Sequence, residues 1–192
     1  MVVVEIFASI QGEGAFLGTP VIFIRLAGCN LQCSFCDTDF SHGSAMSIDD
    51  ICTKLQEWPQ LKTVVITGGE PTIHSQFKDL CATLQQKGYR VNIETNGTTD
   101  IDPQYVNWIT CSPKAAGNYR CNPYADEIKL VVTPEFNPED PAIEFLAARH
   151  APIWLQPEGS QMQAMWKKCM DIALKDPRYR VGVQLHKLME VR

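Results

Sequence analysis

The sequence predicts an α/β fold built on a mainly parallel sheet of about six strands. Short apolar runs recur along the chain, and segments with helical periodicity lie between them. Glycines follow several of these runs and mark the turns at which strands end. With 192 residues the chain suits a single domain spanning residues 1–192, and about six strands are too few for a closed eight-stranded barrel. Two architectures remain, an open doubly wound sheet and a partial barrel.

The expected strands share a high content of β-branched and aromatic residues. They lie at 22–26, 63–67, 90–94, 106–111, 127–132, 153–156 and 180–185. The first runs into a turn at Gly28, and the second is stopped by Gly68 and Gly69. Because parallel strands end at one edge of a sheet, we expect functional side chains to gather at that edge.

Helices are expected between these strands. Ser47 is followed by two aspartates and precedes Ile51, Leu55 and Trp58 at helical spacing, which is typical of a capped helix start. Further helices are expected near 74–86, 138–149 and 162–174. The longest irregular stretches, 10–19 and 112–125, are candidates for functional loops.

Composition excludes several function classes. A formal net charge of −5 and a pI of about 5.3 leave no basic surface for nucleic acid, so direct binding to it is not expected. Residues 1–5 are apolar but lack the basic start of a secretory signal, and Arg25 interrupts the apolar run that begins at Pro20. We therefore expect a cytoplasmic protein without a membrane segment, whose eight cysteines stay reduced.

Three cysteines, Cys29, Cys33 and Cys36, follow the first predicted strand within eight residues. One interpretation is an apolar helix stripe, although Gly28 makes that helix poor. A second is a zinc site, for which His42, Cys52, Cys111 or Cys121 would have to supply the fourth ligand. A third is a four-iron, four-sulfur cluster, in which three thiolates leave one iron open for a bound molecule. The remaining cysteines share no spacing and are most simply buried apolar residues.

The spacing Cys-x3-Cys-x2-Cys, with Phe35 before its last cysteine, resembles the cluster motif of radical S-adenosylmethionine (SAM) enzymes. Residues 67–71, Thr-Gly-Gly-Glu-Pro, resemble the motif that receives the amino group of the cosubstrate in that superfamily. The resemblance implies a [4Fe-4S] cluster, SAM and a partial (incomplete) βα barrel. It also implies that the reduced cluster cleaves the cosubstrate to a radical that abstracts hydrogen from the substrate.

Further segments resemble the family of 7-carboxy-7-deazaguanine synthases. They are Gln11-Gly-Glu-Gly14 with Arg25, Cys36-Asp-Thr38, residues 94–97, 112–114, 127–129 and 155–157, and the tail Gln184-Leu-His-Lys187. This resemblance covers nearly the whole chain. It implies a radical ring contraction of 6-carboxy-5,6,7,8-tetrahydropterin to 7-carboxy-7-deazaguanine with loss of ammonia, in the queuosine precursor pathway.

The same resemblance implies roles for individual residues. Cosubstrate contacts are expected at Phe35, Cys36, Asp37, Gly69, Glu70, Ser112, Pro113, Lys114 and Gln156. Substrate contacts are expected at Ile10, Gln11, Gly12, Glu13, Arg25, Thr67, Glu94 and His186. Thr38 is expected to bind Mg²⁺ through its hydroxyl. No residue is assigned as a catalytic acid or base.

Some of these residues also have simpler interpretations. Arg25 suits an anionic substrate, because a guanidinium binds a carboxylate through two hydrogen bonds, but a strand arginine is as often paired with a surface acid. Residues 37–39 taken alone favour an Asx or Ser/Thr turn. Glu94 at a strand end is as often solvated, and a lone His186 is otherwise more often structural or exposed.

Two other functions compete with this one. A glycyl-radical-enzyme activating enzyme shares the cysteine spacing, but residues 11–14 and Thr38 argue against it. A non-catalytic zinc-binding module is the alternative outside enzymes, and metal analysis would distinguish it. From the resemblance we further expect a small-molecule substrate, a homodimer and a flavodoxin-type electron donor.

Overall fold

Residues 1–191 of the computed structural model are described, so Arg192 of the predicted domain lies outside the described residues. They form one nine-stranded sheet. Its strands are β1 (Val2–Ile10), β2 (Pro20–Leu26), β3 (Ser44–Ala45), β4 (Thr63–Gly68), β5 (Arg90–Thr95), β6 (Trp108–Cys111), β7 (Glu127–Val132), β8 (Ile153–Pro157) and β9 (Tyr179–Val181). All seven predicted strands are present, although the one expected at 180–185 ends at Val181.

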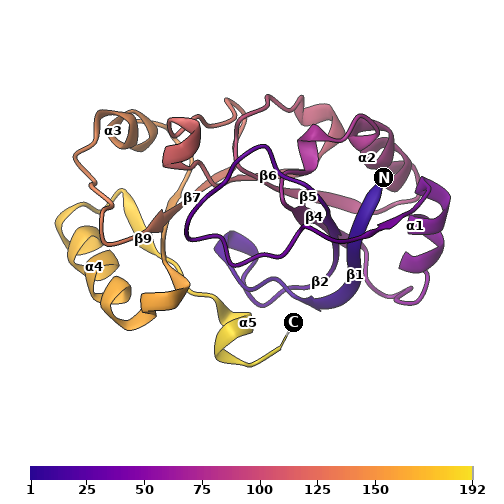
Figure 1. The fold of residues 1–192 in the computed structure, drawn as a ribbon, viewed down its shortest axis with the longest axis horizontal. Coiled ribbons are helices and arrows are strands. Elements are labelled where there is room, and N and C mark those ends of the chain that lie inside the picture. Colours follow the sequence, from indigo (N-terminus) through magenta and orange to yellow (C-terminus); the bar gives the residue numbers. More distant parts are fainter. Residues whose placement is uncertain (192) are drawn as a thin grey trace.

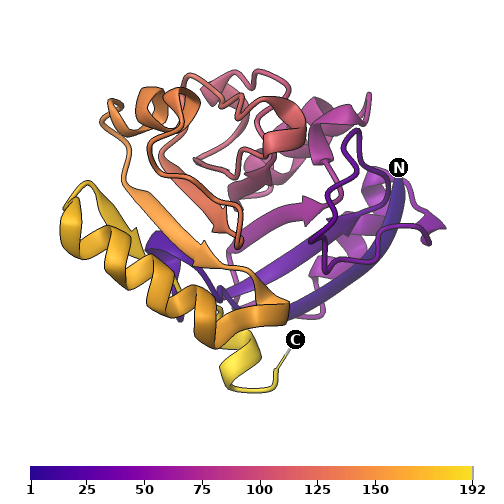
Figure 2. The ribbon, with the colours of Figure 1, turned by 60° about the vertical axis from the view of Figure 1, so that its left-hand side comes forward.

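The strand order is β3-β1-β2-β4-β5-β6-β7-β8-β9. Every neighbouring pair from β2 to β9 is parallel, whereas β1 pairs antiparallel with both β2 and β3. The sheet curves without closing, with β3 and β9 at its edges (Figures 1 and 2). The prediction of a mainly parallel, incomplete barrel is confirmed. The antiparallel strands β1 and β3 were not predicted and extend the sheet beyond the expected size.

The helices are α1 (Ile48–Leu55), α2 (Phe77–Gln86), α3 (Pro141–Ala147), α4 (Met162–Lys175) and α5 (Leu185–Leu188). The predicted start of α1 is confirmed, because Ser47 and Asp50 form a reciprocal capping box. Trp58, expected on this helix, lies in the turn beyond it and packs against the core. None of the helices that residues 1–191 form is long and apolar enough to cross a membrane.

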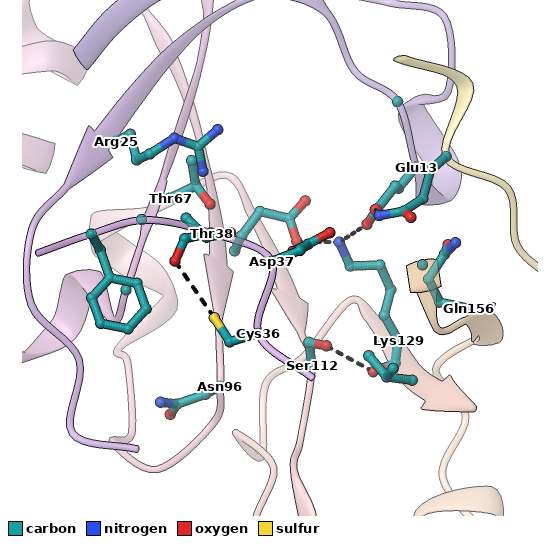
Figure 3. Close-up of a pocket in the computed structure, with 18 of the residues that line it drawn as sticks. Glu13, Arg25, Cys36, Asp37, Thr38, Thr67, Asn96, Ser112, Lys129 and Gln156 are labelled. Carbon is teal, nitrogen blue, oxygen red and sulfur yellow. Dashed lines mark hydrogen bonds and ion pairs between the residues drawn. The ribbon is translucent and has the colours of Figure 1, made fainter. Parts of the chain in front are cut away.

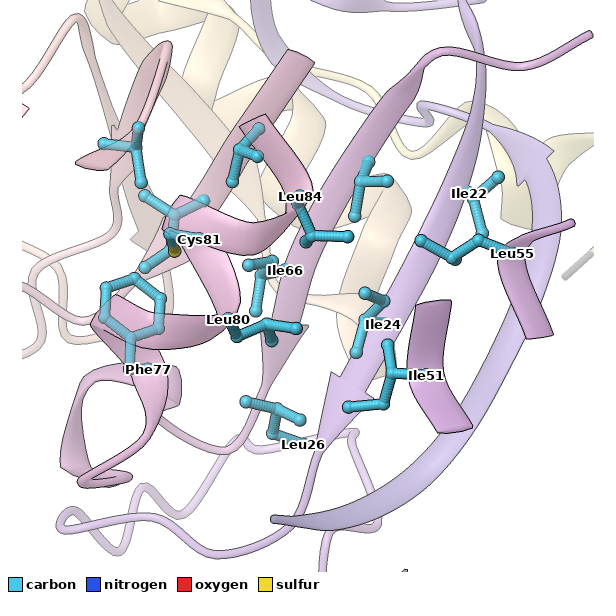
Figure 4. Close-up of a cluster of buried hydrophobic side chains, with 14 of the residues drawn as sticks. Ile22, Ile24, Leu26, Ile51, Leu55, Ile66, Phe77, Leu80, Cys81 and Leu84 are labelled. Carbon is cyan, nitrogen blue, oxygen red and sulfur yellow. The ribbon is translucent and has the colours of Figure 1, made fainter. Parts of the chain in front are cut away.

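Side chains of β2 and β7 alternate between the two faces of the sheet. On β2, Ile22, Ile24 and Leu26 are buried against α1 and α2 (Figure 4), whereas Phe23 and Arg25 point to the opposite face. On β7, Ile128, Leu130 and Val132 pack in a second apolar cluster with residues of α3 and α4. The helices therefore cover one face of the sheet and leave the concave face for polar side chains.

Candidate active site

A pocket of about 570 Å³ lies on the concave face, near the carboxyl ends of the parallel strands (Figure 3). This volume lies within the range of small-molecule sites. All but two of the predicted site residues line it: Ile10, Gln11, Gly12, Glu13, Arg25, Cys29, Cys33, Phe35, Cys36, Asp37, Thr38, Thr67, Gly69, Glu94, Ser112, Lys114, Gln156 and His186. The fold thus brings together segments from both ends of the chain. Glu70 and Pro113 do not line the pocket.

The three cysteines of the motif lie in the irregular segment after β2 and not on a helix, so the helix-stripe interpretation is wrong. Cys29 and Cys33 are half-buried, and Cys36 is exposed. Burial raises the pKa of the Cys33 thiol, as do the neighbouring thiols of Cys36 and Cys29, whereas Lys114 lowers it. The three sulfur atoms therefore lie near one another, at one side of the pocket.

The donor set fits an iron–sulfur cluster better than a single metal ion. Within residues 1–191, no three His, Cys, Asp or Glu side chains converge closely enough to hold one ion. A four-iron cluster does not need such convergence, because each thiolate binds a different iron atom. Of the further ligands that zinc would require, Cys52 and Cys111 are buried in the protein interior, and neither lines the pocket.

The turn after β4 packs directly against the cysteine segment. A Cβ atom on Gly69 would lie 1.9 Å from the Gly28 carbonyl oxygen, so only glycine fits there. The amide of Gly69 donates to the Leu26 carbonyl at 3.1 Å, and that of Glu70 donates to the Gly28 carbonyl at 2.9 Å. These contacts fix the ends of β2 and β4 to each other.

Glu70 is fully buried behind this turn. Its carboxylate accepts hydrogen bonds from the Thr72 amide and hydroxyl, the Thr95 hydroxyl and the Asn96 amide. The side chain therefore holds the loop after β5 in place. The cosubstrate contacts expected at Glu70 and at Pro113 stay predictions.

Gln156, on β8, has a buried side chain of which neither the amide nitrogen nor the carbonyl oxygen has a hydrogen-bond partner. Buried polar groups are rarely left unpaired, because the lost hydration costs about 1–3 kcal/mol. A pocket ligand with both a donor and an acceptor would pair with this amide. Near it, Lys114 donates to the Ser112 hydroxyl at 2.5 Å, and burial lowers the pKa of Lys114.

Arg25 and Thr67 are register partners on β2 and β4, and both line the pocket. The Arg25 Nε atom donates to Glu5 Oε1 at 2.9 Å, and the guanidinium lies 5.9 Å from the centre of the Phe7 ring. Arg25 is therefore paired with an acidic side chain, as expected for an ordinary strand arginine. It also lines the pocket, where a substrate could reach it. Glu5 lines the same pocket but was not predicted from the sequence.

Lys129, on β7, lies between two carboxylates at the floor of the pocket. Its Nζ atom lies 2.5 Å from Glu13 Oε2 and 2.5 Å from Glu94 Oε2. Burial favours the neutral form of Glu13, but the Lys129 ammonium outweighs it and lowers the Glu13 pKa to about 2. Glu94 is ion-paired with Lys129 and lines the pocket, so it is not simply solvated; its expected contact with the substrate stays a prediction. Lys129 is a pocket residue to which no role was assigned from the sequence.

The segment after β9 closes another side of the pocket. The Leu185 amide donates to the Gly12 carbonyl at 2.9 Å, and a Cβ atom on Gly12 would lie 2.0 Å from His186 Nδ1. Lys187 forms an ion pair with Asp37 at 2.5 Å. His186 is half-buried, and this burial lowers its pKa. The cysteine segment, the loop after β1 and the C-terminal segment therefore meet around one cavity.

Comparisons with known proteins agree with this geometry. The family model of the radical SAM superfamily matches residues 23–122. The 7-carboxy-7-deazaguanine synthase of Bacteroides thetaiotaomicron is 40% identical, over 98% of this chain and 97% of the relative. That of Aquifex aeolicus is 37% identical, over 98% of this chain and 93% of the relative.

Among solved structures, the crystal structure of QueE from Escherichia coli aligns with a TM-score of 0.75 at 30% identity, covering 96% of this chain and 94% of that one. The likeness thus extends from the cysteine motif to the C-terminal segment that closes the pocket. With relatives of this identity over nearly its full length, the chain belongs to the 7-carboxy-7-deazaguanine synthase family of the radical SAM superfamily.

Proposed function

We propose that this chain converts 6-carboxy-5,6,7,8-tetrahydropterin into 7-carboxy-7-deazaguanine, with release of ammonia, as a carbon–nitrogen lyase of the queuosine precursor pathway. One observation carries the proposal: a single pocket joins three clustered thiols to an arginine and two buried carboxylates. The three thiols are suitable ligands for the iron–sulfur cluster from which the radical chemistry starts. The charged side chains suit a substrate that has both an anionic substituent and several N–H donors.

Cys29, Cys33 and Cys36 would hold the [4Fe-4S] cluster, which together with SAM would supply the radical that abstracts hydrogen from the substrate. Gly69 allows close backbone approach to the cosubstrate, and the unpaired amide of Gln156 offers it both a donor and an acceptor. Further cosubstrate contacts are proposed for Phe35, Cys36, Asp37, Glu70, Ser112, Pro113 and Lys114.

On the substrate side, Arg25 binds the carboxylate, because a guanidinium matches its two oxygen atoms. Thr67, next to Arg25 across the β2–β4 ladder, donates or accepts one further hydrogen bond. Gln11, Glu13 and Glu94 form hydrogen bonds with the polar groups of the pterin ring. Ile10, Gly12 and His186 form the surrounding wall. No side chain is assigned as a general acid or base.

Thr38 is proposed to bind Mg²⁺ through its hydroxyl, with substrate oxygens and water as the other ligands. The half-buried Thr38 lines the pocket two residues after Cys36 (Figure 3). A cation held there would help to orient the carboxylated ring and would balance negative charge that develops on it.

The closing segment protects the reaction from water and from competing hydrogen donors. His186 fills the space that a side chain at residue 12 would take, and Lys187 ties this segment to Asp37. The Cys36 S–H lies 3.7 Å from the Thr38 carbonyl and donates to it, so residues 36–38 form a tight segment. We further propose that the protein is cytoplasmic, acts as a homodimer and receives electrons from a flavodoxin-type donor.

Anaerobic turnover tests the proposal. The reconstituted protein is reduced and incubated with SAM, Mg²⁺ and 6-carboxy-5,6,7,8-tetrahydropterin, and the product is identified by mass spectrometry. We expect one ammonia per 7-carboxy-7-deazaguanine and no net consumption of SAM. Protein that holds a full cluster and cleaves SAM but leaves the pterin unchanged would contradict the proposal, and formation of a glycyl radical on a partner protein would favour the activating-enzyme alternative.

A further inference from the structure

Lys129 is one of the most deeply buried charged side chains of the protein, with 9% of its side-chain surface exposed. It reaches Glu13, which follows β1, and Glu94, on β5, with Nζ–O distances of 2.5 Å to both. Figure 3 shows its ammonium group directed at Glu13 across the pocket floor. One cation therefore holds two carboxylates that come from distant parts of the sequence.

Each carboxylate is fixed a second time by a glutamine. The Gln184 amide donates to Glu13 Oε1 at 2.7 Å, and the Gln11 amide donates to Glu94 Oε1 at 3.1 Å. An ionised carboxylate accepts about four hydrogen bonds, so each one keeps acceptor capacity beyond these contacts. Because Glu13 and Glu94 line the pocket, a ligand can use that capacity.

The other charged groups around this cluster do not replace Lys129. Glu127 faces it from β7, but its carboxylate accepts from the Ala15 amide and the Thr110 hydroxyl, both at 2.8 Å. Lys114, in the loop after β6, and His186, on α5, also lie near this group of charged side chains. Both interact electrostatically with Glu13 and Lys129. With Lys129 the two carboxylates leave a net charge of −1, and without it they would leave −2 in a buried site.

Two buried carboxylates at this distance repel each other, and burial itself favours the protonated form. The pKa of Glu94 is raised, because burial and the charges of Glu13 and Glu127 outweigh the opposing Lys129 ammonium. A protonated carboxyl donates one hydrogen bond and loses part of its acceptor capacity. Without Lys129 this pKa would rise further, so Lys129 favours the ionised form in which both groups act as full acceptors.

We propose that Lys129 is a positioning residue that keeps Glu13 and Glu94 ionised and oriented, so that together they accept hydrogen bonds from the ring N–H and amino donors of the substrate. The inference rests on the proposed function and deepens it. Arg25 selects the anionic substituent at one end of the pocket, and the carboxylate pair held by Lys129 selects an N–H-rich heterocycle at the other. An ionised carboxylate accepts from more N–H donors than a protonated carboxyl, which uses one oxygen as a donor.

The test uses the reconstituted holoenzyme with Lys129→Met, Lys129→Arg and the double variant Lys129→Met/Glu94→Gln. Lys168→Met is the matched control, because Lys168 is also partly buried but donates to the Thr133 and Pro134 carbonyls away from the pocket. Substrate binding to the unreduced enzyme is measured by calorimetry. The pH dependence of kcat/KM is measured from about pH 5.5 to about pH 9, a range that covers the raised pKa values expected of buried carboxylates. The iron and sulfide content of every variant is measured.

We expect Lys129→Met to retain its iron but to weaken substrate binding by about tenfold or more, since removing one partner of a buried ion pair leaves the other uncompensated. The acidic limb of its kcat/KM profile moves to higher pH, because one carboxylate now holds a proton at neutral pH. The double variant, in which one carboxylate is removed, returns this limb toward the wild-type position. A purely structural role would lower the melting temperature without moving the pH profile.

Lys129→Arg keeps the test decisive if Lys129→Met does not fold. Arginine retains the charge but displaces the carboxylates, so we expect weaker binding with an unchanged pH profile. A shifted pH profile in Lys129→Arg, or a wild-type pH profile in a folded Lys129→Met, would overturn the role of Lys129 while turnover by the wild type stands. A wild-type enzyme that neither binds nor converts the pterin would overturn the proposed function, and this inference with it.

Discussion

Glu5 and Arg25 face each other across the antiparallel β1–β2 ladder, and Arg25 Nε donates to Glu5 Oε1 at 2.9 Å. The guanidinium also lies over the Phe7 ring. Its direction is therefore fixed by protein groups before a ligand binds, which reduces the entropy that binding must offset.

Replacing Arg25 is expected to weaken substrate binding more than cosubstrate cleavage. Arg25→Ala removes a charged donor to the pterin carboxylate, and such hydrogen bonds contribute about 1.5–3 kcal/mol, so the affinity should fall by about tenfold or more. Arg25→Lys should recover part of the loss, because an ammonium lacks the planar pair of donors. Calorimetric titration with the pterin measures both variants. An unchanged dissociation constant in Arg25→Ala would remove this residue from the binding site.

Cluster content should depend on the three motif cysteines alone. Cys33→Ala should lose iron and sulfide, because three thiolates are the whole protein ligand set proposed. Cys81 and Cys169 are fully buried in the apolar core and do not line the pocket, and burial raises the pKa of each thiol to about 12. Cys81→Ala and Cys169→Ala should therefore keep the cluster and lose about 1 kcal/mol of stability.

Iron and sulfide assays after anaerobic reconstitution measure these variants. The triple variant Cys29→Ala/Cys33→Ala/Cys36→Ala serves as the cluster-free reference. Full iron content in that protein would show that the cluster lies elsewhere.

Turnover should be stimulated by Mg²⁺, and Thr38→Ala should weaken this dependence. A neutral hydroxyl is a weak ligand that water can replace, so the variant should need a higher Mg²⁺ concentration for half-maximal rate without losing activity altogether. Initial rates are measured during a Mg²⁺ titration of chelator-treated enzyme, with Thr38→Ser as the variant that keeps the hydroxyl. Superimposable curves for Thr38→Ala and the wild type would make Thr38 a turn residue only.

Gln156→Leu should separate stability from cosubstrate binding. Leucine has a similar volume and removes an amide whose two polar atoms are buried without partners, so the melting temperature of the cluster-free protein should stay the same or rise. SAM affinity of the reconstituted protein should fall by about tenfold, because the proposed hydrogen bonds are lost. Differential scanning fluorimetry and equilibrium dialysis measure the two effects.

Asn122 provides the comparison for Gln156, since its side-chain nitrogen is also buried without a partner but does not line the pocket. Asn122→Ala should change the melting temperature and leave SAM affinity as in the wild type. Equal losses of affinity in both variants would indicate a general packing effect.

Local patterns in the sequence predicted most of the fold and the cysteine site. The spacing of Cys29, Cys33 and Cys36 alone fixes three thiols in one loop, and the period-two pattern of β2 alone separates core from pocket side chains. Strand β1 was not predicted from the local pattern of its residues. The position of β1 follows from its ladder with β2, which is a long-range interaction.

Lys129 illustrates what a single sequence does not reveal. Lys129 lies in a strand that is apolar apart from it and Glu127, and its two carboxylate partners lie far away in the chain, at residues 13 and 94. Only the curvature of the sheet brings the three side chains together. Glu5 was likewise not predicted as a pocket residue, because its contact with Arg25 depends on the pairing of β1 with β2.

Glu13 and Gln184 are hydrogen-bonded although 171 positions separate them in the chain. During translation the strands that hold the cysteine segment, β2 and β4, are made long before residues 184–187. A nascent chain at that stage already has its cysteine loop, but it lacks the wall that His186 and Lys187 provide. This wall of the pocket is therefore among the last parts of the site to be added during synthesis.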